Sequence, residues 1–315
     1  MRTYQGSIIT KTPITPSGPY QCSTASGVWT IDQMVGWQKA GLWPTAGNIA
    51  VGTFAIFALG NSTTTRNKYT YSGDTNGTAT ASSAASCAGS AAGNSTVGIF
   101  AIGNCTTTRD KYTYSGCVNA SATASSATSY GGSATGNSTV GIFARGRCTT
   151  TRDKYTYSGD VNASATASSA ASAYGSAAGN STVGIFALGN GTTTRNKYTY
   201  SGDVNASATA SSAVSLYGSA TGNSTVGIFA LGNTTTRNKY TYSGDVNASA
   251  AAATAASSFG SAAGNSTVGI FAIGSSTTTR DKYTYSGCVV SSGAAASAAS
   301  ALGSAASNGT TGVNV

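Results

Sequence analysis

Hydrophobic and polar positions recur along this chain in a unit that is clearest over residues 179–202. Within it, Val183-Gly-Ile-Phe-Ala-Leu188 is apolar at successive positions, which predicts a short strand that is buried on both faces. A Gly-Asn-Gly turn leads into Thr192–Tyr200, where polar, basic and aromatic side chains alternate between the two faces of a second strand. The pattern therefore predicts a tight pair of strands.

Two further strands complete the unit. Tyr174-Gly-Ser-Ala-Ala-Gly179 comes before the apolar strand and is built of small residues, whereas Val204–Ser211 follows and is the most polar. An aspartate after Ser-Gly, as at Asp203, is typical of the turn between them. The arginine of each unit gives the period, which is 43 residues and shortens once to 42: Arg66, Arg109, Arg152, Arg195, Arg237 and Arg280.

Four antiparallel strands in every 40–50 residues or so are typical of the blade of a β-propeller. We therefore predict an all-β fold in which residues 42–315 form a β-propeller of four-stranded antiparallel blades, about 43 residues each. Small residues in the first strand suit the crowded axis, and the polar fourth strand suits the rim. An open β-solenoid is the competing architecture, although its coils are usually shorter and lack tight hairpin signals.

The ends of the repeat bear on the number of blades. After six units, residues 304–315 match residues 176–187, as if the chain stopped after two strands of a seventh unit. An unfinished blade has an open edge, which natural sheets avoid. We therefore favour seven blades, with residues 1–41 pairing with the C-terminal segment to close the ring. Six blades is the alternative.

Residues 1–41 are not repetitive and are expected to form a separate attachment or closure segment. A short helix is predicted over Gln33–Ala40, capped by Thr30 or Asp32 and ended by Gly41. The run from Gly27-Val-Trp-Thr-Ile-Asp to Lys-Ala-Gly-Leu-Trp-Pro44 resembles a segment of tail and virion-associated proteins of tailed bacteriophages. Within the array, Ile185-Phe-Ala-Leu-Gly189 stands where Kelch repeats have their double-glycine strand, and Arg195-Asn-Lys-Tyr198 follows it. The array in this respect resembles Kelch-type repeats, which implies a propeller.

Composition narrows the chemistry. The chain has no histidine and no glutamate, and its eight acidic residues are all aspartates. Acid–base catalysis draws mostly on histidine, glutamate and aspartate, and only the aspartates are present here. We therefore expect no enzyme activity. With no histidine and no Cys-x-x-Cys pair, we expect no metal site and no cofactor. We find no convincing phosphate-binding loop and no apolar run long enough to span a membrane, and the N-terminus lacks a signal-peptide core.

The net charge of +9 arises because each unit carries one arginine and one lysine. It permits anionic partners such as acidic glycans, although a solvated ring of charge is the simpler interpretation, and we expect no nucleic-acid partner. The strand that carries these basic residues together with tyrosines, Thr192–Tyr200 in the unit described above, is nearly identical in all six units. This near-identity favours a structural role for it. Residues 145 and 147 depart from the repeat and are the better candidates for specificity. The candidate ligand-binding residues are Arg109, Lys111, Arg145, Arg147, Arg152 and Lys154.

Six cysteines are present. Cys105 and Cys148 occupy the same register in neighbouring units, so they are candidates for a bridge between blades. Cys288 belongs to the unit beside the expected closure, which makes Cys22 its candidate partner. The alternative is that all six are reduced or bridge to other subunits.

These observations favour a virion structural protein of a phage, in a tail, fibre or capsid decoration, that assembles with other virion proteins. It would reach the extracellular space on host lysis, in an oligomeric assembly, and would display a propeller for a host-surface glycan. The alternative is a carbohydrate-binding, lectin-like propeller that is not tied to a virion.

Overall fold

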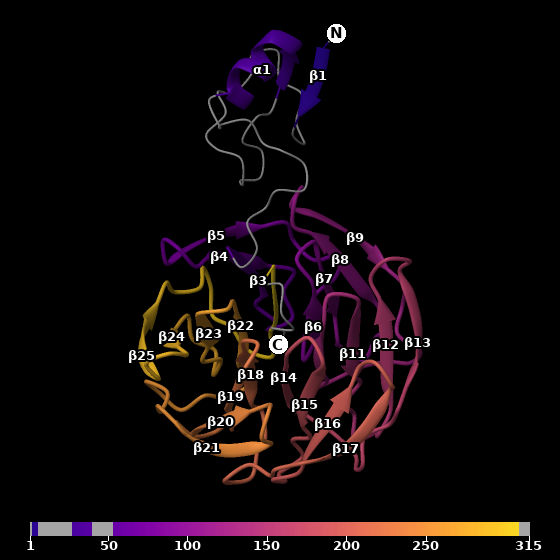
Figure 1. Ribbon diagram of the computed structural model, residues 1–315, viewed down its shortest axis with the longest axis vertical. Coiled ribbons are helices and arrows are strands. Elements are labelled where there is room, and N and C mark those ends of the chain that lie inside the picture. The colour runs from indigo at the N-terminus through magenta and orange to yellow at the C-terminus, as the bar shows by residue number, and fades with distance from the viewer. Residues whose placement is uncertain (1, 6–26, 40–52, 309–315) are drawn as a thin grey trace.

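The computed structural model describes residues 2–5, 27–39 and 53–308. Residues 53–308 form six four-stranded antiparallel sheets, arranged around one axis as the blades of a β-propeller (Figure 1). The all-β propeller predicted from the repeat is therefore confirmed. The favoured number of seven blades is wrong, and the alternative of six is correct.

Each blade contributes one strand to each of four concentric positions. The innermost strands are β6 (Ser90–Gly93), β10 (Ser133–Gly136), β14 (Ser176–Gly179), β18 (Ser219–Gly222), β22 (Ser261–Gly264) and β26 (Ser304–Ser307). The second strands are β3 (Phe54–Ala58), β7 (Val97–Ala101), β11 (Val140–Ala144), β15 (Val183–Ala187), β19 (Val226–Ala230) and β23 (Val268–Ala272). The third strands are β4 (Arg66–Thr70), β8 (Arg109–Thr113), β12 (Arg152–Thr156), β16 (Arg195–Thr199), β20 (Arg237–Thr241) and β24 (Arg280–Thr284). The outermost strands are β5 (Thr75–Ala79), β9 (Val118–Ala122), β13 (Val161–Ala165), β17 (Val204–Ala208), β21 (Val246–Ala250) and β25 (Val289–Gly293).

Burial follows the position of the strand in its blade. The second strand β15 is buried along its whole length, as its unbroken apolar sequence predicts. The outermost strand β17 is largely exposed, which suits its Ser and Ala residues. Across this blade Ala178 pairs with Ile185, and Ile185 pairs with Lys197 in the third strand.

The hydrophobic core is divided among the junctions between neighbouring blades. At one of them Ile185 and Ala187 of β15 pack with Phe229 and Tyr240 of the next blade. Burying one such aromatic side chain contributes about 3–5 kcal/mol by comparison with truncation to alanine. Equivalent clusters fill the other junctions of the ring, so each blade depends on both of its neighbours.

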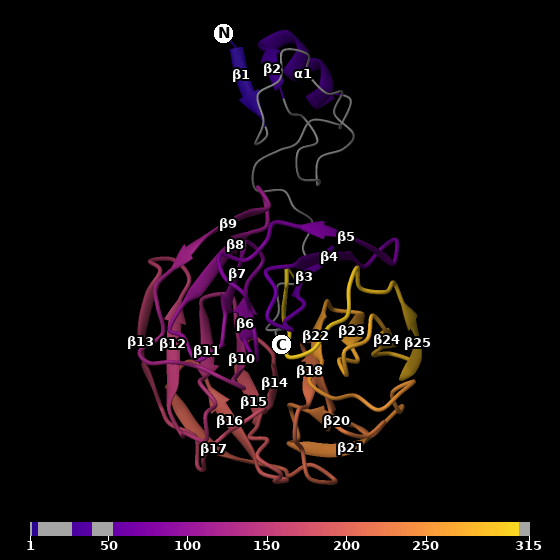
Figure 2. The ribbon, with the colours of Figure 1, turned by 180° about the vertical axis from the view of Figure 1, so that it is seen from behind.

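The two ends of residues 53–308 meet in one blade. β26 pairs antiparallel with β3, which gives the strand order β26-β3-β4-β5 (Figure 2). The backbone of Asn308 extends this closure, because its amide donates to the Phe54 carbonyl at 3.1 Å. Residues 304–307 thus supply the inner strand of the blade that contains β3, and they do not begin a seventh blade.

The closure predicted for residues 1–41 is wrong for the part of that segment that the structure describes. There β1 (Arg2–Gln5) and β2 (Gly27–Thr30) pair with each other. The helix α1 (Ile31–Lys39) follows β2, and Figure 1 shows this unit outside the ring. The described ranges hold no helix with the length and apolarity that crossing a bilayer requires.

Thr30 caps α1. Its hydroxyl accepts a hydrogen bond from the Gln33 amide at 3.3 Å, and the Gln33 side chain accepts one from the Thr30 amide at 2.9 Å. This reciprocal pair is a capping box, which satisfies backbone donors at the start of a helix. Of the two caps considered, Thr30 is therefore the residue used.

Candidate functional site at the mouth of the ring

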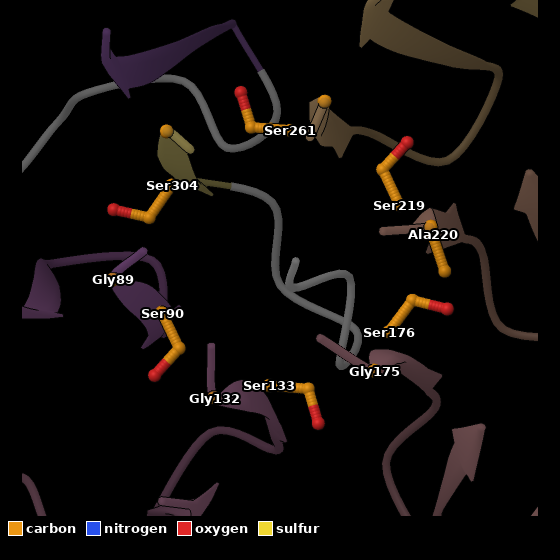
Figure 3. Close-up of a pocket in the computed structure, with 13 residues that line it drawn as sticks. Gly89, Ser90, Gly132, Ser133, Gly175, Ser176, Ser219, Ala220, Ser261 and Ser304 are labelled. Carbon is orange, nitrogen blue, oxygen red and sulfur yellow. The ribbon is translucent and has the colours of Figure 1, made fainter. Parts of the chain in front are cut away.

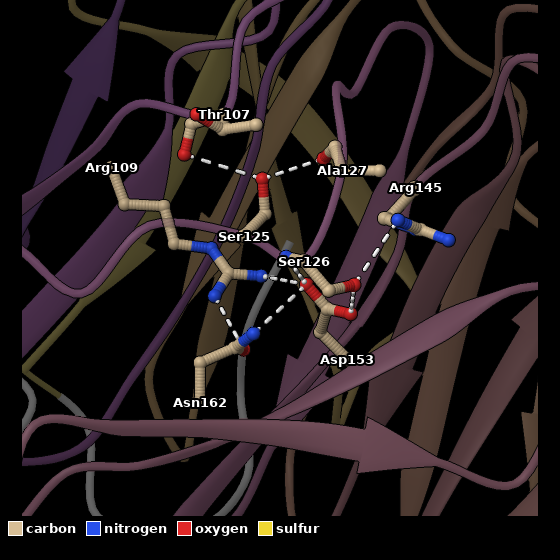
Figure 4. Close-up of polar contacts among 8 residues, drawn as sticks. All are labelled: Thr107, Arg109, Ser125, Ser126, Ala127, Arg145, Asp153 and Asn162. Atoms are coloured by element: carbon tan, nitrogen blue, oxygen red, sulfur yellow. Dashed lines mark hydrogen bonds and ion pairs between the residues drawn. The ribbon is translucent and has the colours of Figure 1, made fainter.

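The arginine of each third strand lies inside the ring, between two blades. Arg109 donates to Asp153 of the next blade at 3.0 Å and to Asn162 at 2.7 Å (Figure 4). Its guanidinium carbon lies 4.5 Å from the centre of the Phe143 ring, a cation–π contact. Only 1% of Arg109 is exposed. Because its partners Asp153 and Phe143 belong to the next blade, this buried contact holds the two blades together.

The same contact recurs at every blade junction in residues 53–308, but the acceptor differs. Three junctions offer a carboxylate and three an amide. The pairs are Arg66 with Asp110, Arg109 with Asp153, Arg237 with Asp281, Arg152 with Asn196, Arg195 with Asn238 and Arg280 with Asn67. The last pair crosses the closure, so the contacts form a complete circle.

The predicted site residues are divided between the interior and the surface. Arg109 and Arg152 are buried, and burial lowers the pKa of Arg152 to about 10. Lys111 is partly exposed, with its amine 3.7 Å from the carboxylate of Asp160 in the next blade. Lys154 occupies the same half-buried position one blade further on. These four residues belong to the repeated framework and are not gathered in one pocket.

Arg145 and Arg147 lie together in the turn between β11 and β12. Arg145 donates to the Ser126 hydroxyl at 3.1 Å, and Ser126 donates to Asp153 at 2.5 Å, which links it to the buried Arg109 contact (Figure 4). Arg147 is exposed and donates to the Thr128 hydroxyl at 2.8 Å. Both arginines therefore contact neutral hydroxyls, and neither forms an ion pair with a carboxylate among the described residues.

A circle of backbone hydrogen bonds surrounds the axis at one mouth of the ring. In it, the residue two positions before each inner strand donates its amide to the carbonyl of the equivalent residue in the preceding blade, at 2.7–3.1 Å. Each has a left-handed backbone, with φ between 51° and 63°. The six residues are Ala88, Gly131, Tyr174, Tyr217, Phe259 and Leu302.

The side chains of this circle break the symmetry of the ring. Tyr174, Tyr217 and Phe259 lie on three consecutive blades, and we call them the aromatic arc. Their rings are in contact, with centroids 4.7 Å apart for Tyr174 and Tyr217 and 3.9 Å apart for Tyr217 and Phe259. At Gly131 a Cβ atom would lie 2.9 Å from the Tyr174 ring, so glycine leaves room for that ring. Tyr130 adds a fourth ring, 5.7 Å from Tyr174.

A pocket without charged side chains lies beside the aromatic arc. Beneath the circle comes a ring of glycines and then a ring of serines, whose side chains surround the axis in Figure 3. The hydroxyls of Ser176, Ser219 and Ser261 are buried and have no hydrogen-bond partner among the described residues. The mouth thus combines aromatic side chains above with serine hydroxyl groups below.

The arginine turn adjoins this mouth. The Tyr130 amide donates to the Arg145 carbonyl at 3.1 Å, and the Arg147 amide donates to the Tyr130 carbonyl at 3.0 Å. The two departures from the repeat, aromatic and basic, are therefore neighbours on one face. Sequence reasoning missed the aromatic arc because Tyr174 was assigned to the first strand. The signal was present, since this register varies between alanine, glycine, tyrosine, phenylalanine and leucine while the position that follows it is glycine in every unit.

The predicted bridge between Cys105 and Cys148 is wrong, because both are free thiols. The segment that enters the next blade runs between the two turns. The Cys105 amide donates to the Ser129 carbonyl, and the Arg147 amide donates to the Tyr130 carbonyl. Equal register in neighbouring blades therefore does not bring these turns together.

The pairing predicted for Cys288 with Cys22 is wrong as well, because Cys288 is a free thiol. Its sulfur lies 3.9 Å from the Lys239 amine of the preceding blade. Cys22 lies outside the described residues.

Comparison of the chain with known protein families and with curated proteins found no match. Within the ranges that the structure describes, no three acidic or cysteine side chains are grouped closely enough to hold a metal ion.

Proposed function

We propose that this protein is a structural component of a bacteriophage virion and displays its propeller outward for recognition of the host surface. Other virion proteins are its partners, in a tail, fibre or capsid decoration. The observation that supports this most is that β26 closes the ring with β3, so β1, β2 and α1 are not needed to complete a blade. The segment that resembles phage virion proteins is thus free to attach the ring to a particle.

The ring suits display because its repeated arginines bind neighbouring blades to one another. The repeated arginines and their acceptors are used between blades, and the hydrophobic clusters occupy the same junctions. A Kelch-like relationship accords with four-stranded blades in this order. A rigid ring presents its mouth in a fixed orientation, which lowers the entropy cost of binding a partner.

The test is whether the protein is part of the particle. Gradient-purified virions should contain it at a constant ratio to the major capsid protein after a high-salt wash, measured by quantitative mass spectrometry. A matched variant lacking residues 1–39 should fold but fail to enter particles. Incorporation of that variant at the level of the full chain would contradict the attachment role.

A lectin-like propeller that acts apart from any particle is the second candidate. The asymmetry of the mouth favours it, because a purely structural ring needs no aromatic arc. Recovery of the protein only as a soluble, saccharide-binding monomer, never with particles, would support this candidate over the first.

A further inference from the structure

We propose that the mouth of the ring binds an acidic saccharide. Its sugar ring stacks on the aromatic arc, and its carboxylate or sulfate group pairs with Arg147 and Arg145. The inference rests on the proposed recognition role for its biological purpose. The binding itself is measurable on the purified chain and does not depend on a particle.

The aromatic arc supplies the stacking surface. Tyr174, Tyr217 and Phe259 are only partly buried, and they line the pocket at the mouth. The face of an aromatic ring is electron-rich and attracts the polarised C–H groups on one face of a sugar ring. The tyrosine hydroxyls add polar groups at the edge of an otherwise apolar surface, which is the usual composition of a small-ligand pocket.

The arginine turn supplies the charge. Arg147 is exposed, and its observed partner is the neutral Thr128 hydroxyl. A guanidinium group recognises a planar carboxylate through two parallel hydrogen bonds, and it binds a sulfate in a similar way. No residue lining the pocket at the mouth is acidic. A net charge of +9 further favours an anionic ligand.

The other blades show that these residues are not required by the fold. The position of Arg147 holds asparagine or serine elsewhere, at Asn61, Asn104, Asn190, Asn233 and Ser275. The position of Arg145 holds leucine or isoleucine, at Leu59, Ile102, Leu188, Leu231 and Ile273. Those aliphatic residues are buried, whereas Arg145 has a buried Nε without a partner among the described residues. The blade β10–β13 therefore carries one arginine, Arg145, in place of a buried aliphatic residue, and a second, Arg147, in place of an exposed polar one.

The first experiment compares ligands by titration calorimetry at about 0.15 M salt. The probes are a galacturonic acid trisaccharide, a sulfated trisaccharide, a neutral galactose trisaccharide and a short single-stranded thymidine oligonucleotide. We expect at least one acidic trisaccharide to bind roughly tenfold or more tightly than the neutral one, as a charge-assisted contact implies. The two acidic probes show which anionic group is preferred.

The second experiment uses variants that copy residues already present in other blades. Arg147→Asn combined with Arg145→Leu should weaken the acidic trisaccharide by roughly tenfold or more and leave the neutral one unchanged. Tyr217→Ala, which reproduces Ala88, should weaken both by about tenfold. Lys39→Ala, a loss of one positive charge on the exposed surface of α1, is the matched control and should change neither.

Any of the following results would overturn the proposal: equal affinity for acidic and neutral trisaccharides, no effect of Tyr217→Ala, or tighter binding of the oligonucleotide than of either acidic probe. Absence of binding to both acidic probes would also overturn it. Particle incorporation of the Tyr217→Ala variant is scored in parallel. Normal incorporation with lost binding separates this inference from the proposed structural role.

Discussion

At the scale of single residues, the buried arginines show how a chain with few charges uses them. Arg109 and Arg152 occupy the same register and make the same cation–π contact, with Phe143 and Phe186. They differ in the acceptor across the junction, which is a carboxylate for Arg109 and an amide for Arg152. The repeat therefore contains its own comparison between a buried ion pair and a buried hydrogen bond to a neutral group.

This comparison gives a first prediction. Arg109→Met should lower the free energy of unfolding by about 3–5 kcal/mol, because Asp153 is left as a buried charge without its partner. Arg152→Met should cost less, about 1–3 kcal/mol, because the side chains that lose a donor, Asn196 and Asn205, are both neutral. Urea unfolding followed by circular dichroism measures both. Equal losses in the two variants would mean that the carboxylate contributes nothing beyond the amide.

The sequence predicts the turns of this fold well, but it predicts poorly which charged side chains are buried. Asp203 and its equivalents after Ser-Gly do lie in turns with a left-handed backbone, φ 51° at Asp203. Alternation along the third strand separates Arg195 from Tyr198 correctly. It does not reveal that Arg195 is also buried, because a neighbouring blade covers each face of the strand. Exposure on a propeller blade depends on packing that no single repeat specifies.

At the scale of elements, the inner strand β26 decides how the ring is completed. It pairs with β3 along Ser304–Ser307, and Ala305 and Ala306 are fully buried. They belong to separate hydrophobic clusters, one on each side of the blade. The four residues of β26 therefore complete one sheet and also contribute to the hydrophobic clusters on both sides of that blade.

A second prediction tests this element by truncation. A chain that ends at Gly303 should lose β26, expose the edge of β3 and either aggregate or unfold at a markedly lower temperature, because unpaired edges associate. A chain that ends at Asn308 keeps β26 and is the matched control. Size-exclusion chromatography and thermal unfolding compare them. A monodisperse Gly303 chain with the stability of the control would show that β26 is dispensable.

The number of blades could not be read from the repeats because the last fragment has two equivalent interpretations. Residues 304–307 match the inner strand of any unit, so they can start a new blade or complete an old one. The choice depends on whether the first unit has its own inner strand, and β3 pairs instead with β26. The candidate site is harder still, because it lies in the variation of one register, at Tyr174 and Tyr217, and not in the motif.

At the scale of the whole molecule, tyrosines fill the junctions around the axis. Burial raises the pKa of Tyr71, Tyr157 and Tyr242 well above the usual value near 10. The folded ring therefore keeps these hydroxyls protonated where the unfolded chain would lose their protons. In all, ten tyrosines among the described residues have a raised pKa.

A third prediction follows for alkaline solution. Below about pH 10 both states hold the tyrosine protons, so this contribution to stability is complete there. Above that value it falls as the pH rises. The six buried arginines, whose pKa is lowered, act in the opposite direction, but the ten tyrosines outnumber them. Absorbance at 295 nm and circular dichroism should change together in one step. Full tyrosine ionisation with an intact ring would contradict this.

The pairing of β26 with β3 also affects how the protein is made. The strand Phe54–Ala58 leaves the ribosome early, yet its inner partner is synthesised some 250 residues later. Throughout translation the nascent chain therefore carries an apolar strand with one unsatisfied edge, which only the last strand of its own chain or of a completed neighbour can pair with. A growing chain that accepts Ser304–Ser307 from a finished neighbour would start a linked polymer, so chaperone demand should be greatest just before the last strand emerges.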